Sequence, residues 1–185
     1  MSQLTIYHEN HPQTPIAEYN TEDAISRELA QVGVRFERWI AQGEIPDNAT
    51  NEAIIAAYQQ YIDRLVAETG YQTYDVISLT PDHPQKRELR QKFLAEHTHD
   101  DDEIRFFNRG KGLFTLHIED KVYEVICEKN DLISVPTGTR HWFDMGENPD
   151  FTCIRLFDSP QGWVANFTGS DIADKFSRLA TSARS

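Results

Sequence analysis

The sequence predicts a mainly β protein: an antiparallel barrel or sandwich with a few helices at its periphery. Two patterns carry this prediction. From Glu103 onward, short segments of alternating apolar and polar residues follow one another, separated by turn residues. Before residue 96, apolar residues at three- and four-residue steps alternate with single strand-like segments. With 185 residues, the chain is long enough for one domain with its own core.

The first expected helix and strand come early in the chain. Thr21 can cap a helix whose first turn is acidic, and Gly33 is a stop signal after it. VRFERWIA (34–41) then alternates strictly, which is typical of a half-buried strand.

A longer helix and a second strand come next. Thr50 can cap this helix, and apolar side chains recur at helical steps as far as Gly70. YQTYDVISL (71–79) has the composition of a strand. Pro84 is expected to open a short helix, QKRELRQKFL, because proline is favoured in the first helical turn. Residues 1–95 therefore form a mixed α/β portion that flanks the barrel.

Residues 96–168 contain the segments expected to form the barrel. Each has the length of a strand, and turn residues separate it from the next. Residues 169–185 are expected to hold a capped helix over SDIADKFSRL, followed by a frayed polar tail. The strand-like segments are EIRFF, GLFTLHI, KVYEVICE, LISVP, HWFDM, FTCIRLF and WVANF.

Charge and cysteine content exclude several functional classes. A net charge of −12 argues against nucleic-acid binding, because that affinity comes mainly from Lys and Arg. The sequence has no signal peptide, and no apolar run approaches the roughly 20 residues that cross a bilayer. Cys127 and Cys153 lie in apolar contexts and are interpreted as buried, reduced thiols of a cytoplasmic protein. The sequence does not decide whether they form a disulfide.

Histidine and carboxylate side chains gather at the start of the barrel region. His97 and His99 are two residues apart, so on a strand they share a face and can reach one point. Glu103 begins the next segment and can reach back, while the turn PTGTRH delivers His141 from further along the chain. Imidazole and carboxylate without thiolate suit Fe(II), Ni(II), Mn(II) or Zn(II). We predict that these four side chains hold one metal ion.

The other histidines need no metal to explain them. His8, His11 and His83 lie near a terminus or a turn and are interpreted as surface residues. His117 lies within a strand-like segment and is interpreted as a structural histidine with hydrogen-bond partners. The three aspartates at 100–102 are interpreted as an acidic turn that faces water.

The spacing of the predicted ligands resembles the two motifs of the cupin superfamily. That resemblance implies a small jelly-roll barrel, or double-stranded β-helix, with the metal inside it. The first motif, H-x-H-x3-E-x6-G, is met by His97, His99, Glu103 and Gly110, and the second, P-x-G-x2-H, by Pro136, Gly138 and His141.

Longer stretches resemble one cupin family, the acireductone dioxygenases of the methionine salvage pathway. The resemblance covers nearly the whole chain, and it implies a cytoplasmic monomer that acts on acireductone and O2. It also implies one Fe(II) or Ni(II) ion on the four predicted ligands. The matching stretches are GVRFERW, YDVISL, EHTHDDDEIRFF, GLFTLHI, EKNDLISVPTGTRHWFDMG, IRLFD and GWVANFTG.

The resemblance implies that the metal selects the products. With Fe(II), acireductone gives 4-methylthio-2-oxobutanoate, the precursor of methionine, and formate. With Ni(II) it gives 3-methylthiopropanoate, formate and carbon monoxide. Four protein ligands on an octahedral ion leave two positions, which an enediolate could fill as a chelate.

Three residues are predicted to surround the substrate closely. Arg105 lies two residues after Glu103 and therefore shares the cavity side of that strand. Its guanidinium could act as a catalytic group that stabilises negative charge on the substrate. The resemblance implies that Phe93 and Phe143 are walls of the substrate site, although plain core packing explains two aromatic residues equally well.

Three further residues are weaker candidates around the site. The resemblance adds Arg155 and Trp163 as substrate contacts, but Arg155 could simply pair with a carboxylate. Glu96, directly before the first predicted ligand, could orient that ligand through a hydrogen bond or could face water.

Two other functions stay open. Another cupin enzyme, an isomerase or an oxygenase of a different enediol or diketone, would differ in its cavity wall. A metal-binding sensor without catalysis would be expected to carry a DNA-binding or signalling segment, and none is recognisable.

Overall fold

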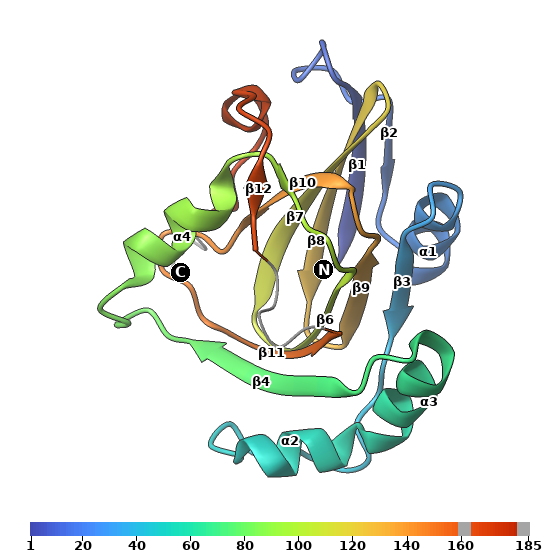
Figure 1. The fold of residues 1–185 in the computed structure, drawn as a ribbon, viewed down its shortest axis with the longest axis vertical. Coiled ribbons are helices and arrows are strands. Elements are labelled where there is room, and N and C mark those ends of the chain that lie inside the picture. Colours follow the sequence, from blue (N-terminus) through green and yellow to red (C-terminus); the bar gives the residue numbers. More distant parts are fainter. Residues whose placement is uncertain (159–163, 181–185) are drawn as a thin grey trace.

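The computed structural model describes residues 1–158 and 164–180, and two antiparallel sheets dominate it (Figure 1). One sheet contains β1 (Gln3–His8), β2 (Ala17–Tyr19), β5 (His97–Thr98), β7 (Lys111–Ile118), β8 (Lys121–Glu128), β10 (Arg140–Asp144) and β12 (Asn166–Phe167). The other contains β3 (Arg35–Arg38), β4 (Thr73–Leu79), β6 (Glu103–Arg109), β9 (Asp131–Val135) and β11 (Phe151–Phe157). The helices are α1 (Glu22–Ala30), α2 (Asn51–Ala57), α3 (Gln59–Thr69), α4 (Lys86–Leu94) and the short 3-10 helix η1 (Ile172–Lys175).

The strand order is not the chain order. The larger sheet runs β12-β5-β10-β7-β8-β1-β2, and the smaller runs β3-β9-β6-β11-β4. Apart from β7 and β8, which pair with each other, strands that follow one another from β5 to β12 lie in alternate sheets, as in a jelly roll. The predicted mainly β architecture with a few peripheral helices is confirmed. Within the described ranges, no helix has the length and apolar character to cross a bilayer.

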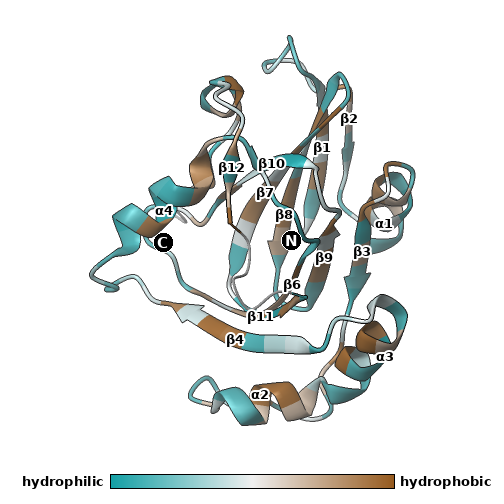
Figure 2. Ribbon diagram, viewed as in Figure 1, coloured by the Kyte–Doolittle hydropathy of each residue, from teal (hydrophilic) through white to brown (hydrophobic). Residues whose placement is uncertain are grey.

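Strand β6 shows how alternation separates the two sides of the smaller sheet. Ile104 and Phe106 face outward and pack with apolar residues of α2 and α3, whose apolar positions are brown in Figure 2. Phe107 faces the space between the sheets and belongs to the main core. Because side chains alternate along a strand, Glu103 and Arg105 lie on the same inner side as Phe107. The same core holds Cys127 and Cys153, which are buried and free, as predicted for reduced thiols.

The long helix expected after Thr50 is divided in two. The predicted cap is confirmed by the hydroxyl of Thr50, which accepts from the backbone N–H of Ala53 at 3.1 Å, and α3 ends at Gly70 in the left-handed conformation. The break lies at Tyr58, which is fully buried. Its hydroxyl donates to Asn108 at 3.2 Å, and this contact with β6 bends the chain out of one continuous helix. The apolar period continues across the break, so the sequence pattern does not reveal it.

The prediction of a terminal helix over SDIADKFSRL is wrong, because only the single turn of η1 forms there. Two backbone N–H groups beyond that turn donate to side chains of the barrel instead of to helix carbonyls. They are those of Ser177, to Glu124 at 3.0 Å, and Leu179, to Asp144 at 2.8 Å. These side-chain acceptors compete with helix formation.

Two other element boundaries also differ from expectation. Helix α4 begins at Lys86, so Pro84 precedes the helix and does not lie in its first turn. Of the strand expected over WVANF, the described part is β12, Asn166–Phe167, and Trp163 lies outside the described residues.

Asp144 joins α4 and the C-terminal segment to β10. Its two oxygens accept from Nε and Nη2 of Arg90 at 2.8 and 3.2 Å, and from the N–H groups of Gly146 and Leu179. Asp144 is 1 % exposed. Burial alone would raise its pKa, yet the hydrogen bonds from Arg90, Gly146 and Leu179 hold it below the ordinary value. Asp144 therefore contributes stability in its ionised form.

Replacing Asp144 with Asn is expected to lower the free energy of unfolding by about 2 to 3 kcal/mol, the range for hydrogen bonds to a buried charge. A carboxylate whose pKa is lower in the folded than in the unfolded protein contributes its full stabilisation at pH values above the unfolded pKa. This stabilisation is lost as pH falls through the folded pKa. The difference between the two proteins should thus be constant above about pH 5 and shrink below about pH 4. Urea unfolding at several pH values tests this, with exposed Asp63→Asn as control. A difference that does not change with pH would contradict the role of the ionised carboxylate.

Candidate metal centre

Three histidines converge between the sheets. His97 on β5 is paired in register with His141 on β10, and His99 follows two residues after His97 on the same face. One ring nitrogen from each lies within 4.8 Å of the others. The three residues are between 1 and 4 % exposed. Such a group can hold a metal ion.

A backbone carbonyl fixes the orientation of each ring. Carbonyl oxygens only accept, so each Nδ1 must carry the proton that it donates. A neutral ring then presents the lone pair of Nε2 to the centre of the cluster, which is how protein imidazoles bind metals. The Nδ1 contacts are His97 to Ala95 at 2.7 Å, His141 to Thr139 at 2.7 Å and His99 to Val164 at 3.0 Å.

Glu103 brings a carboxylate to the same point. Its Oε2 lies 2.9 Å from Nε2 of His141 and 3.0 Å from Nε2 of His99. A carboxylate oxygen and an imidazole lone pair are both acceptors, so a proton or a cation must lie between them. Three imidazoles and one carboxylate form a donor set that suits divalent transition metals. The residues present therefore fit a metal ion.

Neighbouring charges set the protonation of the cluster. Burial alone would raise the pKa of Glu103, yet Arg105 and the hydrogen bonds with His141 and His99 hold it well below its usual range. Burial and the nearby His141 lower the pKa of His97 to about 4. Burial also opposes charge on His99, but Glu103 raises the pKa of that ring. Near neutral pH the cluster thus offers an ionised carboxylate and a neutral imidazole, the forms that bind metals.

Arg105 lies on the wall beside the cluster. Its Nε is 2.9 Å from Oε1 of Glu103, and the residue is 4 % exposed. Its Cζ lies 5.1 Å from the ring centre of Phe143, 5.9 Å from Phe114 and 6.0 Å from Phe93. A buried guanidinium among three aromatic rings is a fixed positive charge with little access to water. The cluster therefore has a fixed positive charge beside it, paired with the carboxylate of Glu103.

The aromatic wall includes one residue that the sequence did not single out. Phe114 on β7 pairs in register with Phe143 on β10, and their ring centres are 4.6 Å apart. Phe93 on α4 lies on another side, with its ring centre 6.4 Å from that of His97. The alternation in GLFTLHI predicts a strand, but it does not show that Phe114 lies beside an arginine. That position could be identified only from the strand register.

Of the two weaker substrate candidates, Arg155 has another partner. It lies directly opposite Arg105 in the register of β6 and β11, on the same side of the sheet. Its Nε and Nη2 lie 2.8 and 2.5 Å from the carboxylate oxygens of Asp75, so it forms the ion pair considered as the alternative. Trp163 belongs to the residues that the structure does not describe.

The acidic residues around the histidines differ from expectation. Glu96 is 2 % exposed, so it does not face water. Its carboxylate contacts His117 and Thr168, and its contacts do not include a ring nitrogen of the three converging histidines. Of the aspartates expected in water, Asp100 is exposed, but Asp102 is half-buried and accepts from the N–H of Thr137 at 2.8 Å. This bond joins the acidic loop to the turn that precedes His141.

Comparison with known proteins gives a consistent relationship over the chain. Residues 3–165 match the model of the ARD/ARD′ family. Acireductone dioxygenase from Serratia proteamaculans is 58 % identical over 179 residues, which cover 97 % of this chain and 99 % of the relative. The protein of that name from Cronobacter sakazakii is 61 % identical over 180 residues, with 97 % and 100 % covered.

A solved structure shares the fold and part of the sequence. It is acireductone dioxygenase from Bacillus anthracis with cadmium ion in its active center. It is 31 % identical, covers 90 % of this chain and 98 % of its own, and superimposes with a TM-score of 0.77.

Proposed function

The chain belongs to the ARD/ARD′ family, and on this premise we propose that it cleaves acireductone with O2 through one Fe(II) or Ni(II) ion. Its relatives over the full chain are dioxygenases, so the protein is an oxidoreductase. The ion is assigned to His97, His99, His141 and Glu103. The observation that carries the proposal is the convergence of three oriented histidine rings, two of which lie within 3.0 Å of one carboxylate. The cadmium ion in the Bacillus anthracis relative supports a divalent ion.

The residues around the ion have distinct tasks. When bound, the ion supplies a Lewis acid and a template for the enediol and O2. Arg105 holds its guanidinium beside Glu103 and stabilises the negative charge of the ionised enediol. Phe93, Phe114 and Phe143 keep water from this charge, which strengthens the electrostatic interaction. Both oxygen atoms of O2 end in the products, so no further reductant is required.

The metal is proposed to select the products. With Fe(II) we expect 4-methylthio-2-oxobutanoate and formate, and with Ni(II) 3-methylthiopropanoate, formate and carbon monoxide. The protein would then serve methionine salvage only in its Fe(II) form. A nitrogen and oxygen site binds Ni(II) more tightly than Fe(II), so metal availability decides which form exists in a cell.

The test is turnover of acireductone under O2 by apo-protein refilled with Fe(II), Ni(II) or redox-inactive Zn(II), with product analysis. We expect consumption with the first two ions and carbon monoxide only with Ni(II). A Zn(II) sample with the same metal content separates the reaction from non-enzymatic oxidation. No consumption by protein correctly loaded with Fe(II) or Ni(II) would refute the substrate assignment.

The protein is further proposed to act as a monomer in the cytoplasm, with acireductone and O2 as its only partners. The net charge of −12 supports the exclusion of nucleic acid. Light scattering should therefore give the mass of one 21.3 kDa chain.

Gly112 makes room for the aromatic wall. A Cβ atom at this position would lie 2.4 Å from Cε2 and 2.6 Å from Cζ of Phe143. Because Phe143 faces Arg105, a Gly112→Ala substitution should push the ring toward the guanidinium. We expect kcat/KM for acireductone to fall by about 10²-fold, the cost of a displacement near 1 Å, with metal content unchanged.

Two further variants separate this effect on turnover from a general loss of stability. Phe143→Leu in the Gly112→Ala protein removes the overlapping ring atoms and should restore the melting temperature of the wild type. Lys111→Ala, at the exposed neighbouring position, should leave turnover unchanged. Full activity of Gly112→Ala would mean that the position of this ring does not matter.

A further inference from the structure

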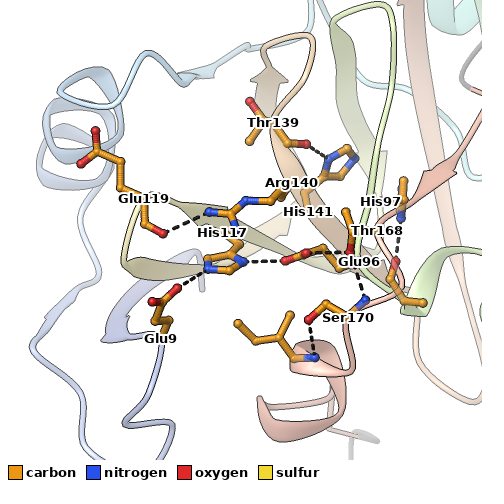
Figure 3. Close-up of polar contacts among 12 residues, drawn as sticks. Glu9, Glu96, His97, His117, Glu119, Thr139, Arg140, His141, Thr168 and Ser170 are labelled. Atoms are coloured by element: carbon orange, nitrogen blue, oxygen red, sulfur yellow. Dashed lines mark hydrogen bonds and ion pairs between the residues drawn. The ribbon is translucent and has the colours of Figure 1, made fainter.

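A partly buried network of hydrogen-bonded side chains lies next to the predicted ligands (Figure 3). His117 on β7 is 6 % exposed, and its Nδ1 and Nε2 lie 2.5 Å from Glu96 and 2.7 Å from Glu9. Ionised carboxylates only accept hydrogen bonds, so each ring nitrogen is placed to donate. The second oxygen of Glu96 accepts from the hydroxyl of Thr168 at 2.8 Å. The four side chains thus form one continuous chain of hydrogen bonds.

At the Thr168 end of this network, a short strand lies against the histidines. In β12, Phe167 is paired in register with His97, and the two ring centres are 5.9 Å apart. The backbone N–H of Thr168 donates to the carbonyl of Glu96 at 3.1 Å. Thr168 therefore contacts Glu96 through both its backbone and its side chain, directly before His97 in the chain.

The same segment orients a second predicted ligand. The carbonyl of Val164 accepts from Nδ1 of His99 at 3.0 Å, so the position of residues 164–168 sets the direction of that ring. The side chains of Val164 and Phe167 are 64 and 57 % exposed. Their burial therefore contributes little to holding the segment in place. The segment is held instead by the backbone pairing of β12 with β5 and by the two hydrogen bonds of Thr168 to Glu96.

At the other end of the network, His117 restrains the side chain of Glu96. A buried carboxylate that loses one of its partners is costly, so the contact with His117 stabilises the position of the Glu96 side chain. Glu9, from the loop after β1, restrains the other side of the ring. Within the described part of the chain, the His117 ring forms its hydrogen bonds with Glu96 and Glu9, so its route to the predicted ligands runs through Glu96 and Thr168.

We propose that His117 is a positioning residue for the metal centre: through Glu96 and Thr168 it keeps residues 164–168 seated on His97 and His99. The inference rests on the proposed function only in requiring that these histidines bind a metal. It predicts that a change at His117 loosens a segment that His117 does not touch and weakens metal binding.

The test is a His117→Gln variant, with half-exposed His83→Gln as matched control. Ni(II) affinity is measured by competition with a chromophoric chelator, and hydrogen exchange of residues 164–168 is followed in the Ni(II)-loaded protein. We expect Ni(II) affinity to fall about 10- to 100-fold, as for other groups that orient metal ligands. The Thr168 amide should exchange faster in the variant, while His83→Gln should match the wild type in both measurements.

Thr168→Val provides a second route to the same result. It removes one hydroxyl at an exposed position and leaves His117 in place, so it remains decisive if His117→Gln does not fold. Faster exchange of residues 164–168 and weaker Ni(II) binding support the proposal. A lower melting temperature with unchanged affinity and exchange would assign the network to stability alone and overturn it. Failure of the wild type to bind Ni(II) would overturn the proposed function as well.

Discussion

Replacement of His141 by alanine is expected to abolish metal binding and acireductone turnover together. The ring is 2 % exposed, its Nδ1 is fixed by Thr139 and its Nε2 lies 2.9 Å from Glu103. Removing it deletes one donor and leaves Glu103 with fewer partners in a buried site. The loss of Fe(II) or Ni(II) affinity should exceed the roughly 100-fold that marks groups outside the ligand set.

The measurement is metal content per chain after dialysis against a weak chelator, together with turnover of the same samples. His11→Ala is the control, since His11 is exposed and distant in sequence from the cluster. Glu103→Gln tests the carboxylate separately, because the amide keeps the shape but removes the charge. One equivalent of metal in His141→Ala would exclude this ring as a ligand.

The convergence of the three histidines was predictable because it follows from local rules. His97 and His99 share a face through the two-residue period of a strand, and the turn before His141 returns that strand to the neighbouring position. The carbonyls that orient the rings were not predictable. They come from the backbone, and that of Val164 is 65 residues from His99, so no side-chain pattern marks it.

The errors in the fold have the same physical origin. The apolar repeat in residues 51–69 is continuous, yet the helix breaks at Tyr58, whose hydroxyl donates to Asn108 on another strand. Glu96 looked equally suited to water or to a ligand, and its actual partners, His117 and Thr168, are 21 and 72 residues away. Local propensity predicted where elements occur, whereas distant hydrogen-bond partners decided how they end.

Replacement of Arg105 by lysine is expected to leave the metal bound and to lower kcat by about 10²- to 10³-fold, the effect of removing one donor from a charge-stabilising site. Lysine keeps the positive charge, but it lacks the planar set of donors that reaches a carboxylate and a substrate oxygen together. The guanidinium is already engaged by Oε1 of Glu103 at 2.9 Å. A single ammonium group could contact either the Glu103 carboxylate or the substrate oxygen, but not both in the same geometry.

The decisive readout is the combination of metal content, KM and kcat. If Arg105 acts on charge that develops on the substrate, kcat and kcat/KM should fall together while KM changes little. If it only holds Glu103, the Arg105→Lys protein should lose metal in proportion to activity, and added metal should restore the rate. Arg109→Lys is the matched control, because Arg109 is the last residue of the same strand and its partner Asp150 is exposed. Full turnover by metal-loaded Arg105→Lys would show that charge alone suffices at this position, and would leave the aromatic wall as the main source of substrate positioning.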